Sequence, residues 1–135
     1  MKYLIFHGSV ILLVGLLCGA PFGRAIVRGA PEATVRAWRV AHAGVAVGGI
    51  LLLALIAAVP QLQLSATAIL VLVWSFIASG YGFALALPLG AYSGYRGLKL
   101  EPPLVNRVVY FGNMVSVIGS LVGVVLLLVG AYAAL

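Results

Sequence analysis

Apolar residues dominate four long segments of the chain, and most of the charged residues lie in the short stretches between them. The apolar segments cover residues 3–18, 39–59, 66–89 and 106–134. A predominantly apolar segment near 20 residues long is able to cross a bilayer as a helix. Prolines, which end helices, punctuate the connections at Pro60, Pro88, Pro102 and Pro103. Ser65 precedes the third segment as a candidate helix N-cap. The pattern predicts an all-α integral membrane bundle of four transmembrane helices in one domain, residues 1–135.

The composition agrees with a membrane location. Of the 135 residues, 64% are hydrophobic and only 7% are charged, which is too little charge for the surface of a soluble domain. The net charge of +6 indicates no nucleic-acid partner, because the basic residues form no basic helix face and no alternation with aromatic residues. The expected surroundings of this chain are therefore the lipid bilayer.

The basic residues are concentrated in alternate connections. Those between the first and second segments, and between the third and fourth, are Arg24, Arg28, Arg36, Arg39, Arg96, Lys99 and Arg107. Cytoplasmic loops carry an excess of Lys and Arg. This distribution predicts a bacterial-type inner (cytoplasmic) membrane protein with both basic connections inside the cell and both termini outside. A cleaved signal peptide is an alternative for the first segment, although His7 is atypical of one.

Polar side chains inside the segments are the candidates for function, because placing them in hydrocarbon is costly. These residues are His7, Ser9, His42, Ser75, Ser79, Tyr81, Asn113, Ser116 and Ser120. The segments contain no carboxylate, since the two acidic residues, Glu32 and Glu101, lie in connections. A paired-carboxylate hydrolase and a Ser-His-Asp triad are thereby excluded. A proton-coupled or cation-coupled transporter is disfavoured for the same reason.

His42 is the strongest single candidate. On a helix, the residues one or two turns away on its face are Trp38, Arg39, Val45, Ala46 and Gly49. Small residues thus follow the imidazole on its apolar side, and arginines precede it. This arrangement suits haem b, with His42 as the iron ligand, Gly49 admitting the macrocycle, and Arg39 and Arg36 meeting the propionates. Ordinary helix packing with snorkelling polar side chains is the alternative.

Three further polar residues have two possible roles each. Tyr81 in the third segment and Asn113 in the fourth are candidate catalytic residues that would position a substrate in an apolar pocket, or they form hydrogen bonds between helices. His7 lies several helical turns from His42 along the membrane normal. We therefore do not expect the two histidines to share one iron. For His7 we expect an interhelical hydrogen bond, with a role as second ligand as the alternative.

Three stretches of the chain are similar to a known family. They are "HG" at residues 7–8, "RVAHAGVAVGG" at residues 39–49 and "YSGYRGLKLEPP" at residues 92–103. With these stretches, the chain resembles the small four-span membrane isomerases that include styrene oxide isomerase and hydroxylaminobenzene mutase.

The resemblance implies a specific chemistry. It implies a membrane homotrimer with haem b at the subunit interfaces and His42 as the axial ligand. Ferric iron in the epoxide isomerase acts as a Lewis acid and converts the epoxide to an aldehyde, whereas the mutase moves a hydroxyl group from nitrogen to the aromatic ring. The substrate would be small, apolar and aromatic. In the register of the resemblance, Gly48 and Leu87 replace an asparagine and a catalytic tyrosine of the epoxide isomerase. We therefore expect weak activity on styrene oxide and better activity on a different C–O or N–O substrate.

Two other functions remain as alternatives at this point. The histidine-glycine pair of the first segment also resembles the haem-ligand span of heme-copper oxidases, which would favour a non-catalytic haem protein for electron transfer, sensing or gas binding. A small transporter or structural subunit without haem is the other alternative, and purified protein without colour would favour it.

The predicted topology is testable with a fusion protein. A reporter that fluoresces only in the cytoplasm, fused after Leu135, should stay dark, because the basic connections hold the opposite side of the bundle inside the cell. The same reporter inserted between Arg28 and Pro31 should fluoresce and serves as the control. A bright fusion at Leu135 would reverse the orientation.

Overall fold

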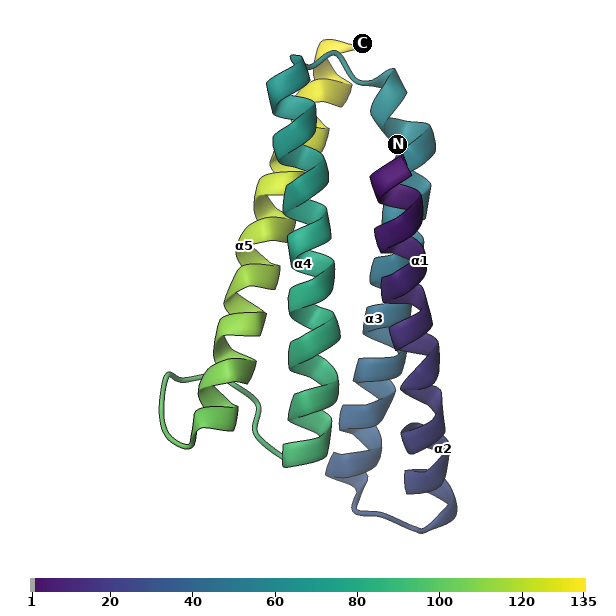
Figure 1. Cartoon of the computed structure of the whole chain (residues 1–135), viewed down its shortest axis with the longest axis vertical. Coiled ribbons are helices and arrows are strands. Elements are labelled where there is room, and N and C mark those ends of the chain that lie inside the picture. Colours follow the sequence, from purple (N-terminus) through teal and green to yellow (C-terminus); the bar gives the residue numbers. More distant parts are fainter. Residues whose placement is uncertain (1) are drawn as a thin grey trace.

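The computed structural model describes residues 2–135, and these residues form helices joined by short connections (Figure 1). The elements in chain order are α1 (Lys2–Leu17), α2 (Gly19–Val27), α3 (Glu32–Ala58), the single 3₁₀ turn η1 (Val59–Gln61), α4 (Ala66–Ser93) and α5 (Leu104–Ala133). α1 with α2, α3 with η1, α4 and α5 are each long and apolar enough to cross a membrane. The predicted all-α bundle of four transmembrane helices is therefore confirmed.

Several helices extend beyond the apolar segments. The first continues after Cys18 as α2, and α3 begins at Glu32, seven residues before Arg39. α4 continues through Pro88 to Ser93, although the sequence places Pro88 at the helix end. Membrane helices tolerate an internal proline when neighbouring groups satisfy the freed carbonyl. The N-cap prediction is confirmed, because the Ala68 backbone N–H donates to Ser65 Oγ over 3.2 Å.

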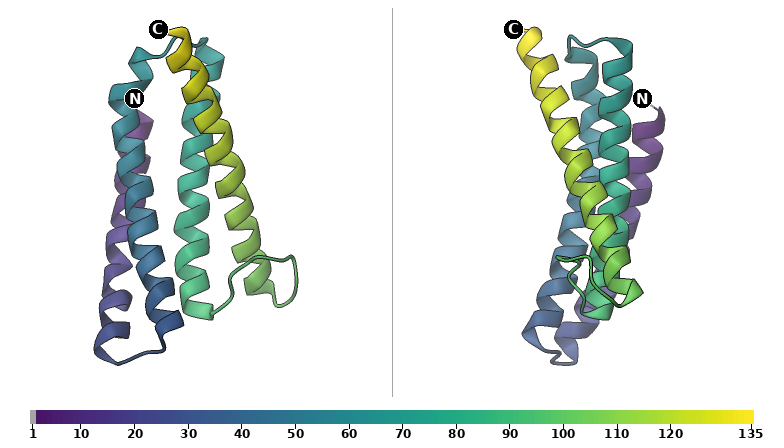
Figure 2. Two further views of the ribbon diagram at one scale, coloured as in Figure 1. Left: turned by 180° about the vertical axis from the view of Figure 1, so that it is seen from behind. Right: turned by 90° about the vertical axis from the view of Figure 1, so that its left-hand side faces the viewer.

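The helices pack as a row of neighbours. α1 packs along α3, α3 along α4, and α4 along α5. Both termini lie at the end opposite to the two basic connections (Figure 1). At the terminal end, α5 is tied to the α3–α4 connection by a hydrogen bond from Gln63 N–H to the Gly130 carbonyl oxygen. At the basic end, α5 is splayed away from α3 (Figure 2).

Glycines bring α1 and α3 into backbone contact. A Cβ at Gly49 would lie 2.5 Å from the Leu12 backbone nitrogen, and one at Gly15 would overlap the Ala46 backbone. Such close approach between membrane helices is typical of small residues, since lipid provides no hydrophobic drive for association. The position of α1 along α3 is therefore set by shape at these two glycines.

A similar contact joins α4 to α5, with polar side chains added. A Cβ at Gly119 would lie 2.6 Å from the Ser75 carbonyl oxygen. Ser79 Oγ donates to the Ser116 carbonyl oxygen over 2.8 Å, and Ser116 Oγ donates to the Gly112 carbonyl oxygen over 2.7 Å. Both serines are buried. These two residues thus have a packing role.

The connection from α4 to α5 is fixed by one buried side chain. α4 ends at Ser93 and is capped by Gly94, whose φ of +79° favours glycine. Asn106 Oδ1 accepts from the Gly97 N–H over 3.1 Å, and Asn106 Nδ2 donates to the carbonyl oxygens of Lys99 and Glu101 over 3.0 and 2.9 Å. The basic loop therefore has a defined shape.

Gly49 and Gly48 provide a matched pair of variants for the α1–α3 contact. Gly49→Ala should destabilise the protein by about 1–3 kcal/mol, because the new methyl group overlaps the α1 backbone. The nearest atom to a Cβ at Gly48 is Ile11 Cγ2 at 4.0 Å, so Gly48→Ala should be tolerated. Thermal unfolding of the detergent-purified proteins measures the stability of both variants. Equal unfolding temperatures for the two variants would argue against the close contact.

Candidate functional site

His42 lies on α3 beside the junction of α1 and α2. Its Nδ1 is 2.9 Å from the Gly15 carbonyl oxygen. Because a carbonyl oxygen can only accept, Nδ1 carries the proton and donates it. In the neutral ring the lone pair then lies on Nε2, which is the usual arrangement of a metal-ligating histidine.

The second ring nitrogen of His42 is accessible. Nε2 has no hydrogen-bond partner within residues 2–135. In this same part of the chain, every buried side-chain nitrogen or oxygen has a partner. Nε2 is therefore not completely buried in the subunit, and no hydrogen bond within this part of the chain occupies its lone pair.

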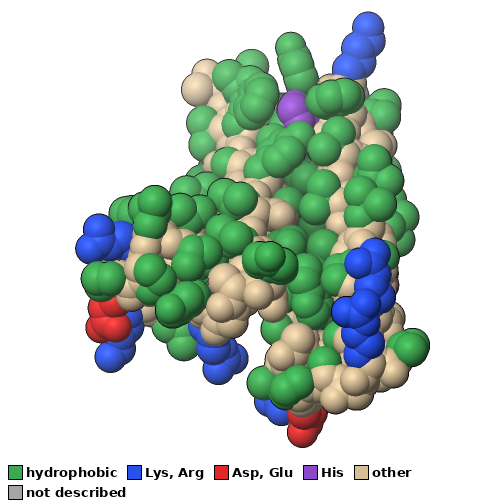
Figure 3. Space-filling model, turned by 60° about the horizontal axis from the view of Figure 1, so that its bottom comes forward, with side chains coloured by type: hydrophobic (Ala, Val, Ile, Leu, Met, Phe, Trp, Pro, Cys, Tyr) green, Lys and Arg blue, Asp and Glu red, His purple; other side chains and the backbone are tan. Residues whose placement is uncertain are grey.

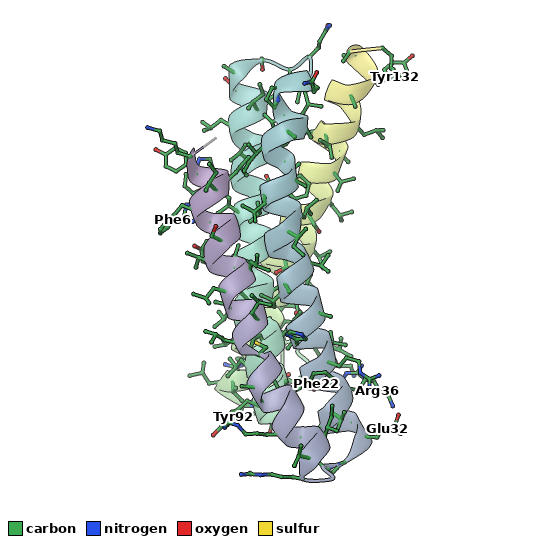
Figure 4. The ribbon with its side chains drawn as sticks, turned by 90° about the vertical axis from the view of Figure 1, so that its right-hand side faces the viewer. Phe6, Phe22, Glu32, Arg36, Tyr92 and Tyr132 are labelled. Carbon is green, nitrogen blue, oxygen red and sulfur yellow. The ribbon has the colours of Figure 1, made fainter. Side chains whose placement is uncertain are left out.

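The walls around the His42 ring come from α2. A Cβ at Gly19 would lie 3.3 Å from His42 Cε1 and 3.9 Å from Nε2, so a side chain at this position would cover the ring edge. The Phe22 ring is nearly parallel to the imidazole, with 6.1 Å between centroids and 25° between planes. In Figure 4 the Phe22 side chain lies between α2 and α3. Gly19 and Phe22 thus border the imidazole, and the three residues together are called the notch.

The two arginines expected near His42 have different partners. The Arg39 guanidinium carbon is 5.9 Å from the Phe22 ring centroid, so this cation lies at the notch. Arg36 forms an exposed ion pair with Glu32 at 2.8 Å, and Figure 4 shows both side chains extending outward from α3. Six positions separate Arg36 from His42, which places them about 120° apart around the helix. The structure therefore brings only Arg39 to the imidazole.

Tyr81 lies with the other histidine. Its hydroxyl is 2.9 Å from His7 Nδ1, and the Trp74 ring lies 5.8 Å from the His7 ring. His7 precedes Gly15 by eight residues, so this pair is about 12 Å farther along α1 than the carbonyl that holds His42. The structure does not bring Tyr81 to His42.

Asn113 and Gly49 also lie away from the notch. Asn113 Nδ2 donates to the Arg96 carbonyl oxygen over 3.1 Å and lines a groove between α3, α4 and α5. Gly49 is buried beneath α1 at Leu12. Sequence reasoning missed Gly15, Gly19 and Phe22. The spacing of the two glycines in "GLLCG" was an available signal, since small residues four apart mark a close helix contact.

The donor set around His42 limits what can bind there. Residues 2–135 contain no group of three or more His, Cys, Asp or Glu side chains able to hold a metal ion. His42 therefore does not belong to such a group. A macrocycle supplies its own equatorial nitrogens and requires a single axial histidine.

A comparison with protein-family models supplies the deciding observation. The model of the styrene oxide isomerase family matches residues 1–132. The chain belongs to this family. Searches of curated proteins and of solved structures each found no significant match. Membership in the styrene oxide isomerase family confirms the expected resemblance and suggests a membrane isomerase.

This member of the styrene oxide isomerase family has apolar surroundings at two positions of interest. A Cβ at Gly44 would lie 3.4 Å from Leu87 Cδ1, and Leu87 also packs against the cluster of Cys18, Ala41 and Ala91. Gly48 has room for a Cβ, with no atom closer than Ile11 Cγ2. Leu87 is thus a packing residue, whereas Gly48 leaves space beside α3.

Proposed function

We propose that this protein is a membrane-embedded isomerase that rearranges a small apolar, aromatic substrate with haem b bound through His42. The observation that carries the proposal is the hydrogen bond from His42 Nδ1 to the Gly15 carbonyl oxygen, which leaves an accessible Nε2. Family membership over nearly the whole chain supports the isomerase class.

The residues around the notch fit the cofactor. The Gly15 carbonyl orients the imidazole, and Gly19 leaves space at its edge. The flat Phe22 ring offers an apolar surface for a macrocycle, and Arg39 offers a cation for a propionate. Arg36 extends outward from α3 and Gly49 is covered by α1, so the proposed ligand set consists of His42 and Arg39.

When bound, haem b supplies a ferric Lewis acid that polarises a C–O or N–O bond. The residues of this chain then have three tasks. The Gly15 carbonyl keeps the His42 proton on Nδ1, so that Nε2 remains a ligand. Arg39 would neutralise a propionate of the haem at the membrane boundary. The apolar Phe22 ring helps to exclude water from the site. Because the reaction is an isomerisation, it consumes no water, electrons or second substrate.

The absence of acidic side chains from the four apolar segments is compatible with this chemistry. Both acidic residues, Glu32 and Glu101, lie outside the apolar segments. Metal polarisation of oxygen requires no carboxylate acid–base pair. A substrate that partitions into lipid can also reach a site inside the bilayer from the side.

We further propose that the active assembly is a homotrimer in a bacterial-type inner membrane, with the basic connections in the cytoplasm. Nε2 is accessible in the single subunit, and α5 contacts mainly α4. A neighbouring copy could therefore cover the notch and exclude lipid from it. This arrangement follows the homotrimer that the family resemblance implies.

A haem with two histidine ligands from one chain has less support. His7 is held by Tyr81 about 12 Å farther along α1 than the His42 site. This separation disfavours the electron-transfer alternative, which would use both histidines on one iron.

Replacement of the ligand should remove the haem. His42→Ala should lose the Soret absorbance of the purified protein, because no other side chain at this depth offers an imidazole. His7→Ala should retain most of it and is the matched control. Full haem retention in His42→Ala would contradict the assignment.

A second variant separates loss of haem from loss of fold. Gly19→Leu keeps both histidines but places a side chain over the His42 ring edge. It should reduce haem content several-fold while the helical circular dichroism stays unchanged. Gly23→Leu is the control, because no atom lies within 4 Å of a Cβ at that position.

The rate of isomerisation of each substrate should depend on the polarity of the side chains beside α3. The native protein should convert styrene oxide weakly and a hydroxylaminoarene or bulkier epoxide faster, and reduction by dithionite should slow both. Gly48→Asn introduces the asparagine that the epoxide isomerase has at this position of the resemblance, and it should raise styrene oxide turnover by about tenfold or more, since one hydrogen-bond donor at a reacting oxygen is typically worth about a hundredfold in rate. Chromatography of the isomeric products measures this. Isomer formation from neither class, with a six-coordinate spectrum that added imidazole leaves unchanged, would favour a non-catalytic haem protein.

A further inference from the structure

A groove of about 440 Å³ lies at the basic end of the bundle, between α3, α4 and α5. Neither residue of the proposed ligand set, His42 or Arg39, lines it, although Leu87, at the family's tyrosine position, and Asn113 do. Its apolar floor is formed by Val40, Ala86, Leu87, Ala91 and Val109. Val40 and His42 are two positions apart on α3 and therefore about 160° apart around the helix. The groove thus lies on the side of α3 away from the imidazole.

The mouth of the groove is cationic. Arg36 of α3 and Arg96 of the α4–α5 loop both line it, and no acidic side chain does. The partner of Arg36 is Glu32, whose side chain is 87% exposed. An exposed ion pair of this kind contributes little, so Arg36 is available to another anion. Figure 3 shows Lys and Arg side chains gathered at this end of the molecule, on both sides of a hollow.

The wall that carries Arg96 is preformed. Asn113 on α5 donates to the Arg96 carbonyl oxygen, and buried Asn106 makes three hydrogen bonds within the same loop. A ligand that binds here therefore does not have to order the loop. It meets an apolar floor with donors and cations already placed at one end.

We propose that this groove binds an anionic phospholipid from the leaflet at the basic end of the bundle. The headgroup phosphate meets Arg36 and Arg96, and an acyl chain lies along Val40, Leu87 and Val109. Basic pockets between transmembrane helices are typical binding sites for anionic headgroups. The floor favours a lipid over a soluble anion, because Val40 is 50% exposed and opens the groove sideways toward the hydrocarbon.

Such a lipid would bridge two helices that have little contact of their own. α3 and α5 are splayed apart at this end, and each of them packs along α4, which lies between them (Figure 2). Bound lipid fills the space between them and should stabilise the folded protein by mass action. Lipid binding and thermal stability should therefore change together.

The test uses full-length protein in neutral detergent. Dioleoylphosphatidylglycerol should bind at one saturable site by native mass spectrometry and raise the unfolding temperature, whereas dioleoylphosphatidylcholine should do neither. The double variant Arg36→Gln/Arg96→Gln should bind phosphatidylglycerol about twenty-fivefold more weakly, since each cation near an anionic lipid contributes roughly fivefold. Arg24→Gln/Arg28→Gln removes the same charge away from the groove and should bind normally.

A second pair of variants tests the floor without changing charge. Val40→Trp should fill the groove and abolish stabilisation by phosphatidylglycerol. Val47→Trp alters a similarly exposed position two turns farther along the same helix face. This variant should still be stabilised by phosphatidylglycerol. Equal binding by both double-arginine variants would overturn the proposal in favour of diffuse charge attraction. Stabilisation by sodium phosphate as strong as that by phosphatidylglycerol would replace the lipid with a soluble anion.

Discussion

The backbone contact between α1 and α3 at Gly15 determines the position of the candidate site. Gly15 has no side chain, so α1 approaches until a Cβ there would overlap Ala46. At that separation the Gly15 carbonyl reaches His42 Nδ1. A larger residue at position 15 would move α1 outward, and the imidazole would lose the acceptor that decides which nitrogen is protonated. Helix packing and ligand chemistry therefore depend on the same glycine.

The two histidines show how the surroundings distinguish chemically identical side chains. His7 hydrogen-bonds to a tyrosine hydroxyl and lies among the rings of Tyr3, Phe6 and Trp74. His42 hydrogen-bonds to a backbone carbonyl, and the Phe22 ring stacks on it. A carbonyl acceptor leaves a single possible tautomer, whereas a hydroxyl can donate or accept. The fixed tautomer is the reason that His42 is the better candidate for a ligand.

α3 separates two environments that are both built from small apolar residues and arginine. On one side, Arg39 and Phe22 accompany the imidazole; on the other, Arg36 faces a groove bounded by α5 and its preceding loop. The proposed cofactor and the proposed lipid are both amphiphiles with an anionic end at the same depth. Each cation can therefore serve one ligand without competing for the other.

The sequence alone determined the class of the molecule. Four apolar segments, the scarcity of charge and the basic alternate connections predict a four-helix membrane bundle, because transfer of each residue into lipid is nearly independent of its neighbours. The polar residues inside the segments marked His42, and the motif around it indicated the family. Helix ends were less accurate, since α3 and α4 continue beyond their apolar segments and Pro88 lies within a helix.

Only the tertiary structure decided which residues meet. Periodicity placed Gly49 and Arg39 on the face of His42, but it did not show that α1 covers Gly49, that Tyr81 pairs with His7, or that Arg36 faces a groove. Helix association in lipid depends on local shape and hydrogen bonding, because every apolar face is already solvated by hydrocarbon. A hydropathy pattern therefore predicts that a helix spans the membrane, whereas its neighbours and its rotation depend on contacts between residues far apart in the sequence.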